Sequence, residues 1–334
     1  MAATTVLVVH QFVICGYSDS PLLKGARYSL IAVTVFFVIS GYLITKSWIE
    51  DPVLWRFILK RLLRILPALI FVTLITIFIM GPLTTTLSLG EYFTTRTTWQ
   101  YLHNIHLKMK YVLPGVFLSN PYPRSVNGSL WTLPVEFKWY LIVALLGVSK
   151  LIRIKAVPIV CMLILAWWIY SFSQPGVDEL DYFWYFGLFF LEGMILTSVE
   201  LSKKVLLIIF LLSLLFSYLN YWFIASVLFL PVSVIYFGRE SFPIIRSVSR
   251  FGDLSYGVYI FAFPTQQTIV HFLGASTPFV LLMAYALIST YFLAYLSWNF
   301  IESPALSLKK YLYSPGVPQP YTHEGALKPT PCVT

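Results

Sequence analysis

The sequence predicts an all-α polytopic membrane protein with about ten transmembrane helices, and two observations support this fold class. Of the 334 residues, 58% are hydrophobic and only 11% are charged, whereas a soluble domain has roughly 25% charged residues. The apolar residues also gather in runs that approach the length of about 20 residues needed to span a bilayer. These features exclude a water-soluble globular enzyme, a disordered chain, a collagen and a coiled coil.

Charges, prolines and short polar links separate the apolar runs from one another. The seventh and eighth runs are nearly continuous, so their division is open. The predicted spans are residues 1–15, 29–48, 62–80, 131–148, 156–173, 182–199, 204–219, 221–238, 254–273 and 278–300.

The basic residues predict the orientation of these spans. With the N-terminus inside, 16 Lys and Arg residues fall in inner segments and six in outer ones, while Lys138 lies within a span. Because inner loops of membrane proteins are enriched in Lys and Arg, this asymmetry predicts an N-in, C-in topology. It also accounts for the net charge of +9, so membrane lipid rather than nucleic acid is the expected partner.

Two regions outside the spans stand out. Residues 81–130 form one long outer loop with helical patches and several aromatic residues, and we expect this loop to cover a functional site. Residues 311–334 are rich in proline and are expected to form a flexible cytoplasmic tail after a membrane domain of residues 1–310. The three cysteines match no metal-ligand spacing, so no metal is predicted.

Two ionisable residues inside predicted spans are candidates for catalysis, because such residues are costly in a membrane. His10 lies toward the outer end of the first span, and Glu136 reaches a similar depth in the fourth. We expect the two to pair, with the carboxylate orienting the imidazole as a general base. Lys138 lies on another face of the same helix. The alternative for His10 is a hydrogen-bonded core or interfacial histidine.

A basic cluster begins the third span at the cytoplasmic side. Lys60 precedes Arg61 and Arg64, which share one helix face at a spacing of three residues. Arginine pairs bind phosphate in bidentate fashion, so the cluster could form a phosphate clamp. The alternative is that these residues only mark the inner side of the membrane.

The second span carries the sequence Ser40-Gly41-Tyr42 in its cytoplasmic half. A Ser-Gly pair in an apolar helix permits a kink or a close approach of two backbones. Residues 127–132, 253–259 and 302–304 hold weaker motifs, for which helix caps or interfacial anchors are the simple interpretation.

Taken together and in this order, several motifs resemble the membrane acyltransferase-3 family of O-acyltransferases that modify envelope carbohydrates. The resemblance covers roughly residues 1–310. The segments that carry it are VLVVH (6–10), FFVISGYLIT (36–45), RLLRILPAL (61–69), NGSLWTLPVEFKWYL (127–141), LSYGVYIFAFP (254–264) and ESPA (302–305).

The resemblance implies an enzyme of the bacterial inner membrane that transfers an acyl group, expected to be acetyl, from cytoplasmic acetyl-CoA to an extracytoplasmic carbohydrate or glycolipid. Acetyl-CoA would be a co-substrate, with no permanently bound cofactor. By position, His10 matches the catalytic histidine of the family and Glu136 matches its acidic residue. Arg61 and Arg64 match its basic pair. We group Lys60, Ser40 and Tyr42 with that pair as the expected donor site.

The sequence departs from the family pattern in two places. The family has an arginine eleven positions before the histidine, which would fall two positions before Met1. We therefore expect the first span to be incomplete, either because the start was placed at an internal methionine or because the truncation is real and inactivating. In the ninth span, Ala262 stands where many members have a histidine.

Two other classes of protein remain alternatives at this stage. A proton-coupled transporter would also have many spans and a buried His and Glu, although the sequence lacks two similar halves. An inactive membrane scaffold would follow from a real truncation. The sequence leaves open the acceptor, the choice between direct transfer and an acyl-enzyme, and the oligomeric state.

Overall fold

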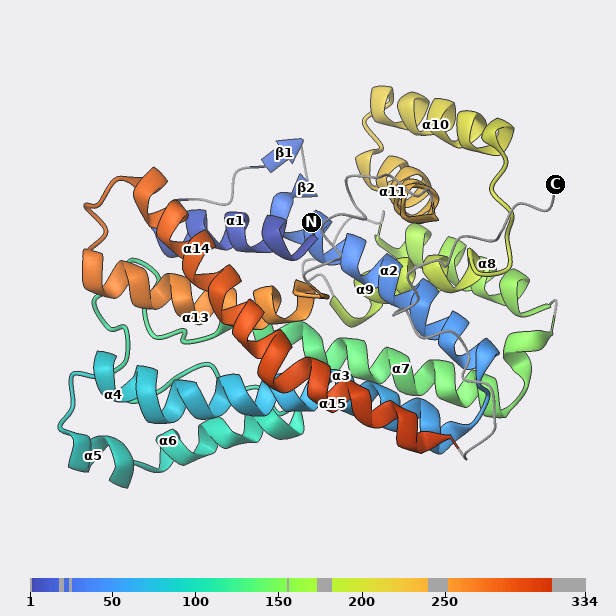
Figure 1. Cartoon of the computed structure of the whole chain (residues 1–334). Coiled ribbons are helices and arrows are strands. Elements are labelled where there is room, and N and C mark those ends of the chain that lie inside the picture. Colours follow the sequence, from blue (N-terminus) through green and yellow to red (C-terminus); the bar gives the residue numbers. More distant parts are fainter. Residues whose placement is uncertain are drawn as a thin grey trace, which may run out of the picture.

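The computed structural model describes residues 2–17, 21–23, 26–154, 156–172, 182–239 and 252–313. The described part of the chain is almost entirely helical. Its extended elements are an antiparallel pair, β1 (Pro21–Leu23) and β2 (Ala26–Arg27), and an isolated bridge between Thr85 and Val116. Most long helices run in broadly the same direction, with α2 and α14 crossing them obliquely (Figure 1).

The helices fall into a long and a short group. The long helices are α1 (Ala2–Ile14), α2 (Tyr28–Glu50), α3 (Leu54–Ile75), α7 (Thr132–Val148), α8 (Ala156–Phe172), α9 (Tyr182–Ile195), α10 (Lys203–Tyr218), α11 (Trp222–Arg239), α13 (Ser255–Leu273) and α14 (Phe279–Ser297). The short α-helices are α4 (Gly81–Thr84), α5 (Leu89–Thr94), α6 (Arg96–Gln100) and α15 (Ser303–Ser307). The remaining elements are two π-helical turns, η1 (Thr76–Met80) and η6 (Trp298–Glu302), and four 3₁₀ turns, η2 (Tyr101–His106), η3 (Gly128–Trp131), η4 (Leu151–Arg153) and η7 (Leu308–Leu312).

A helix occupies each of the ten segments predicted to span the membrane. Among the described residues, five helical stretches are long and apolar enough to cross a bilayer, and the helices at Ala2–Ile14 and Tyr182–Ile195 are shorter apolar ones. The chain is therefore a multi-pass membrane protein, while ten crossings and the N-in, C-in orientation stay predictions. The five stretches are Leu30–Glu50, Leu54–Thr84, Gly128–Val148, Trp222–Arg239 and Phe279–Leu312.

Small residues allow α2 and α9 to approach closely. A side chain at Gly41 would collide with the backbone carbonyl of Phe190, and one at Gly193 would collide with the carbonyl of Val38. Interfaces between membrane helices favour glycine for this reason, since close backbone contact maximises van der Waals packing. The close approach predicted from Ser40-Gly41 is confirmed.

Aromatic rings fill the core beside this contact. Phe37 of α2 stacks on Phe186 of α9 at 4.9 Å between ring centroids. Trp139 of α7 stacks on Phe190 at 5.5 Å, and Gly187 leaves the space that the Trp139 ring occupies. The largest core cluster therefore lies where α2, α7 and α9 meet.

The long loop predicted between the third and fourth spans is an ordered cap with its own core. We call residues 85–127 the cap segment. Ser88 and Glu91 form a reciprocal capping box at the start of α5. The buried rings of Tyr92, Tyr101 and Phe117 pack together in a separate hydrophobic cluster. Tyr92 also donates a hydrogen bond of 3.0 Å to the carbonyl of Ile77 in the π-helical turn η1, so the cap is fixed to the end of α3.

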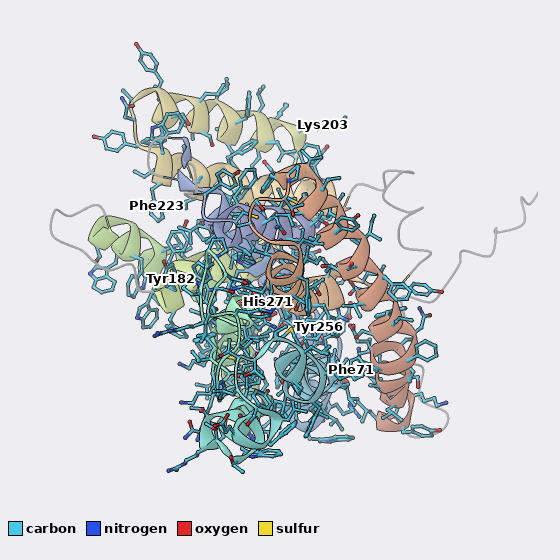
Figure 2. All side chains as sticks on the ribbon, turned by 90° about the vertical axis from the view of Figure 1, so that its left-hand side faces the viewer. Phe71, Tyr182, Lys203, Phe223, Tyr256 and His271 are labelled. Atoms are coloured by element: carbon cyan, nitrogen blue, oxygen red, sulfur yellow. The ribbon has the colours of Figure 1, made fainter. Side chains whose placement is uncertain are left out.

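The periphery contributes less to the core. In Figure 2, Lys203 at the start of α10 lies at the edge of the view, while Tyr256 and His271 of α13 lie near its centre. Most side chains of α10 are exposed and apolar, which suits a lipid-facing helix. The predicted flexible tail falls outside the described residues beyond position 313.

We expect Gly41→Ala to destabilise the protein, because the added methyl group overlaps the Phe190 backbone. Overpacking of this kind costs roughly 1–3 kcal/mol and should lower the thermal midpoint of the detergent-solubilised protein. Gly238→Ala in α11 is the matched control, because nothing lies within 4 Å of a side chain at that position. Equal midpoints for the two variants would contradict the assigned packing.

Candidate active site

His10 lies in α1 and is positioned mainly by α13, which runs beside it (Figure 1). The side chain of Gln266 is fully buried and donates hydrogen bonds to the carbonyl of Leu7 at 2.7 Å and to the side-chain oxygen of Gln11 at 2.8 Å. The ring of Phe263 packs edge-on against the imidazole at 5.2 Å. These contacts fix the depth and rotation of α1, and hence of His10.

The imidazole of His10 lies close to a serine in the turn that precedes α7. Ser129 Oγ lies 3.4 Å from His10 Nδ1. Two hydrogen bonds hold this turn: the side chain of Asn127 accepts from the Ser129 N–H at 3.2 Å, and the Tyr259 hydroxyl donates to the Ser129 carbonyl at 2.6 Å. A side chain at Gly128 would meet the ring of Phe263, so glycine is required there.

Residues 127–132 were interpreted from the sequence as a polar turn that begins a helix, and this is confirmed. Their place beside His10 was missed. The signal in the sequence was the short segment Asn127-Gly128-Ser129, which has two polar side chains and directly precedes an apolar run.

Glu136 forms a second polar group, which lies in α7 beyond the turn that contains Ser129. Its side chain is 3% exposed, and it accepts hydrogen bonds from Ser40 Oγ at 2.8 Å and from the hydroxyl of Tyr140. The pairing of Glu136 with His10 stays a prediction, and Ser129 Oγ lies 3.4 Å from the imidazole. Glu136 follows Ser129 by seven residues, which is about 10 Å along a helix, and its carboxylate is bound by α2 and by its own helix.

Arg61 is a half-buried cation with unused hydrogen-bonding capacity. Its Nη2 donates to Ser47 Oγ at 3.0 Å, whereas its buried Nε has no hydrogen-bond partner. The guanidinium also interacts electrostatically with Glu136 and Tyr140. An unpaired buried donor is costly, so this nitrogen is the clearest sign of a missing ligand within the predicted basic cluster.

Arg64 is fully engaged in ion pairs. Its Nη2 lies 2.6 Å from Asp253 and its Nη1 lies 3.2 Å from Glu302, which is buried in η6. Burial opposes ionisation of Asp253, yet Arg64 together with Ser255 lowers the pKa of this carboxyl below its usual value. Arg64 therefore joins α3 to the start of α13 and to η6. The Asp253 carboxylate accepts hydrogen bonds from the N–H and hydroxyl of Ser255, the first residue of α13, and its pairing with Arg64 was missed.

The other predicted donor-site residues have partners within the fold. Lys60, 8% exposed, donates to Asp51 at 2.6 Å. Ser40 is bound to Glu136, as described above, and the hydroxyl of Tyr42 accepts from Arg239 at 3.2 Å. Arg61 is thus the member of the predicted set that has a buried side-chain atom without a hydrogen-bond partner. Among the described residues, no three His, Cys, Asp or Glu side chains gather closely enough to hold a metal ion.

Asp51 is the centre of a charged cluster just outside the helices. It accepts from Arg56, Lys60 and Tyr313 at distances of 2.6, 2.6 and 3.0 Å. Burial alone would raise the pKa of Asp51, but these hydrogen bonds outweigh it and the pKa is lowered. The cluster holds the connection between α2 and α3 in one conformation.

We expect Asp51→Asn to destabilise the folded protein by roughly 2–3 kcal/mol. This is less than the 3–5 kcal/mol for breaking a fully buried pair, because the side chain of Arg56 keeps 26% exposure. Glu50→Gln is the control, since the pair of Glu50 with Lys46 is exposed and 3.9 Å long. Thermal midpoints in detergent measure both effects, and a loss for Glu50→Gln as large as that for Asp51→Asn would contradict the assignment.

The lowered pKa of Asp51 also predicts how the stability difference between wild type and Asp51→Asn depends on pH. Because the pKa of Asp51 is lower in the folded state, its stabilisation is complete above the unfolded value of about 3.9 and is lost as the pH falls through the folded value. The difference between wild type and Asp51→Asn should therefore be constant from neutral pH to about pH 5 and shrink below about pH 4.

A half-buried histidine, a buried carboxylate and an arginine with a buried, unpartnered Nε lie together in a multi-pass helical fold. Such groups mark a functional site in a membrane protein, either an enzyme or a proton-coupled carrier. Comparison with known sequences separates these classes. The model of a family described as an acyltransferase domain matches residues 1–299. The chain therefore belongs to the acyltransferase-3 family, and it is a membrane O-acyltransferase.

Individual relatives agree with this placement. The chain is 32% identical over 328 residues to an O-acetyl transferase of Shigella phage Sf6, with 92% of this chain and 96% of the relative covered. It is 26% identical to nodulation protein 10 of Rhizobium leguminosarum bv. viciae, with coverage of 84% and 83%. It is 25% identical to the peptidoglycan O-acetyltransferase OatA of Listeria monocytogenes, with coverage of 84% of this chain and 51% of that protein. No solved structure gives a significant match.

Proposed function

We propose that the enzyme transfers an acetyl group from cytoplasmic acetyl-CoA to a hydroxyl of an extracytoplasmic carbohydrate, such as lipopolysaccharide or exopolysaccharide, at the bacterial inner membrane. Two relatives are named for acetyl transfer to oxygen, and one of them is named for peptidoglycan. The observation that carries the proposal is His10, which lies within the helical bundle at the base of the turn joining the cap segment to α7.

The orientation in this proposal follows the distribution of charge. The basic residues around the connection of α2 to α3 face the cytoplasm, as the enrichment of Lys and Arg on that side of membranes predicts. The cap segment then lies outside, where an envelope carbohydrate arrives. Arg61 stands on the donor side of the site, and His10 stands nearer the acceptor.

His10 acts in this mechanism as the general base. Ser129 Oγ accepts the hydrogen of Nδ1, and this tautomer places the basic lone pair of the imidazole on Nε2. Nε2 removes the proton from the acceptor hydroxyl while its oxygen attacks the thioester carbonyl. The new carbon–oxygen bond forms, the carbon–sulfur bond breaks, and the leaving thiolate of CoA takes the proton from the imidazolium.

Arg61 binds a phosphate of the donor through its unpartnered Nε, because a guanidinium pairs with phosphate oxygens in a fixed geometry. Glu136 acts as a positioning residue that balances the charge of Arg61. Lys60 and Arg64 add positive potential at the cytoplasmic end, where their carboxylate partners hold them in place. Ser40 acts through Glu136.

We expect His10→Ala to lower acetyl transfer by roughly 10²–10⁴-fold, the usual range for loss of a general base. Membrane abundance should be unchanged, because alanine is tolerated in an apolar helix. His103→Ala, at an exposed position of the cap segment, is the matched control. Transfer of radiolabelled acetyl groups to purified envelope polysaccharide measures the effect, and full activity of His10→Ala at normal abundance would refute the role of His10.

The same assay distinguishes direct transfer from an acyl-enzyme. Under direct transfer, wild-type enzyme incubated with labelled acetyl-CoA and no acceptor stays unlabelled. Label on His10 itself would instead identify an acetyl-histidine intermediate.

We expect Arg61→Gln to raise the KM for acetyl-CoA roughly tenfold or more, because one charge-assisted hydrogen bond contributes about 1.5–3 kcal/mol. Arg96→Gln, at an exposed position of α6, should leave this KM unchanged. Insertion and orientation are checked first by protease accessibility. If the KM for acetyl-CoA is unchanged in a correctly inserted Arg61→Gln enzyme, Arg61 does not bind the donor. It then only marks the inner side of the membrane.

A further inference from the structure

We propose that the cap segment carries a binding subsite for the acceptor carbohydrate, in which the ring of Tyr122 is the platform for a pyranose and Gln267 holds the platform in register with His10. This inference rests on the proposed function, and it names the part of the chain that recognises the acceptor.

The platform is fixed by a buried amide clamp. The side chain of Gln267, in α13, is fully buried. Its Nε2 donates to the carbonyl of Tyr122 and to that of Ser125, each at 2.8 Å. Asn120, in turn, donates to the side-chain oxygen of Gln267 at 2.7 Å and to its backbone carbonyl at 2.9 Å. Four hydrogen bonds thus join residues 120–125 to a single residue of α13, two through backbone carbonyls and two through the side chain of Asn120.

The clamp also sets the distance from Tyr122 to His10. Gln267 lies one helical turn from Phe263, whose ring packs edge-on against His10 at 5.2 Å and against Tyr122 at 6.0 Å. Phe263 is buried, and its ring contacts both the imidazole and the tyrosine. The neighbouring Pro121 packs against Gly16, just beyond the end of α1, so the cap is in contact with the helix that carries His10.

The chemistry of Tyr122 suits a carbohydrate. Its side chain is 41% exposed although its backbone is held on both sides. The face of an aromatic ring is electron-rich and packs against the C–H groups of one face of a sugar. A rigid exposed ring also loses little conformational freedom when it binds. A pyranose stacked on Tyr122 would place a neighbouring hydroxyl toward Phe263 and His10, where general-base catalysis needs it.

Tyrosine is also common at membrane interfaces, where it anchors a protein to the lipid headgroups. An anchoring tyrosine requires no fixed relation to a buried histidine. Tyr122, however, contacts the same ring as His10, and its backbone carbonyl is bound by a buried side chain of the helix that positions His10. These contacts favour the acceptor platform, and the membrane anchor becomes an outcome of the test.

The experiment compares Tyr122→Ala, Tyr122→Phe and Tyr285→Ala in the full-length enzyme reconstituted into lipid vesicles. Tyr285, on α14, has a similar exposure of 52% and serves as the matched control. The acceptor probe is base-treated, and therefore de-O-acetylated, lipopolysaccharide purified from the cells that express the enzyme. Its KM, the KM for acetyl-CoA and its binding in the absence of donor are measured for each variant.

We expect Tyr122→Ala to raise the KM for the polysaccharide roughly two- to tenfold, in keeping with the strength of one aromatic stacking contact. Its binding should weaken by a similar factor, while the KM for acetyl-CoA should not change. Tyr122→Phe retains the ring and should keep the wild-type values, as should Tyr285→Ala.

Gln267→Leu tests the clamp through a double-mutant cycle. If Gln267 acts through Tyr122, the two effects on acceptor KM are non-additive, and Tyr122→Ala has little further effect in the Gln267→Leu enzyme. A purely structural role for Gln267 would instead change abundance and both KM values together, with independent effects of the two substitutions.

The outcomes separate the two proposals. Wild-type transfer with an unchanged acceptor KM in Tyr122→Ala would overturn the platform and leave the proposed function intact. Reduced membrane abundance of Tyr122→Ala with unchanged acceptor KM would identify a membrane anchor. Polysaccharide binding that depends on Tyr122, without any transfer, would support the platform and overturn the proposed function. If the wild-type enzyme neither binds nor acetylates the polysaccharide, both proposals are wrong for this acceptor class.

Discussion

An ionised side chain inside a bilayer needs a partner, and the partners of three cations on α3 determine much of the structure around the site. Lys60 reaches back to Asp51 before the helix begins, Arg61 reaches α2 at Ser47, and Arg64 reaches two carboxylates from the last third of the described chain. Because desolvation makes an unpaired charge costly, these contacts constrain how α2, α13 and η6 are arranged around α3. The incomplete pairing of Arg61 stands out against this background.

Polar groups in the bundle lie at two separate levels. The proposed reaction requires this separation. His10 and Ser129 form the level next to the cap segment, together with the hydroxyl of Tyr259. Glu136 and Ser40 form the second level, nearer the basic end of α3. Thr132 hydrogen-bonds to Tyr259 at 2.5 Å and lies one helical turn from Glu136, so α7 connects the two. A thioester donor that enters from one side and an alcohol that enters from the other can meet between these levels.

The sequence alone was sufficient to predict the helical segments and the small-residue packing of α2, because apolar runs and a Ser-Gly pair are local features. It was not sufficient to predict that Ser129 lies close to His10. The segment before α7 begins with a 3₁₀ turn, which advances by about 120° per residue instead of the 100° of an α-helix, and so a simple helical projection misplaces its side chains. The partners of Arg64 lie 189 and 238 residues away along the chain, a separation that hydropathy and charge counting cannot bridge. Gln267 gave no signal either, since a single glutamine in an apolar run is equally compatible with a lipid-interface position.

The π-helical turn at the end of α14 shows how local geometry serves this arrangement. Glu302 ends η6, where one extra residue per turn widens the helix. Its two oxygens are divided between Ser297 of the preceding helix at 2.9 Å and Arg64 of α3 at 3.2 Å. An uninterrupted α-helix would rotate position 302 relative to Ser297 by a different angle, so the π turn allows one buried carboxylate to satisfy both partners. Gly257, directly beside this carboxylate, leaves the room that the pair needs. The geometry of α14 is thus matched to the position of Arg64, and through it to the helix that carries Arg61.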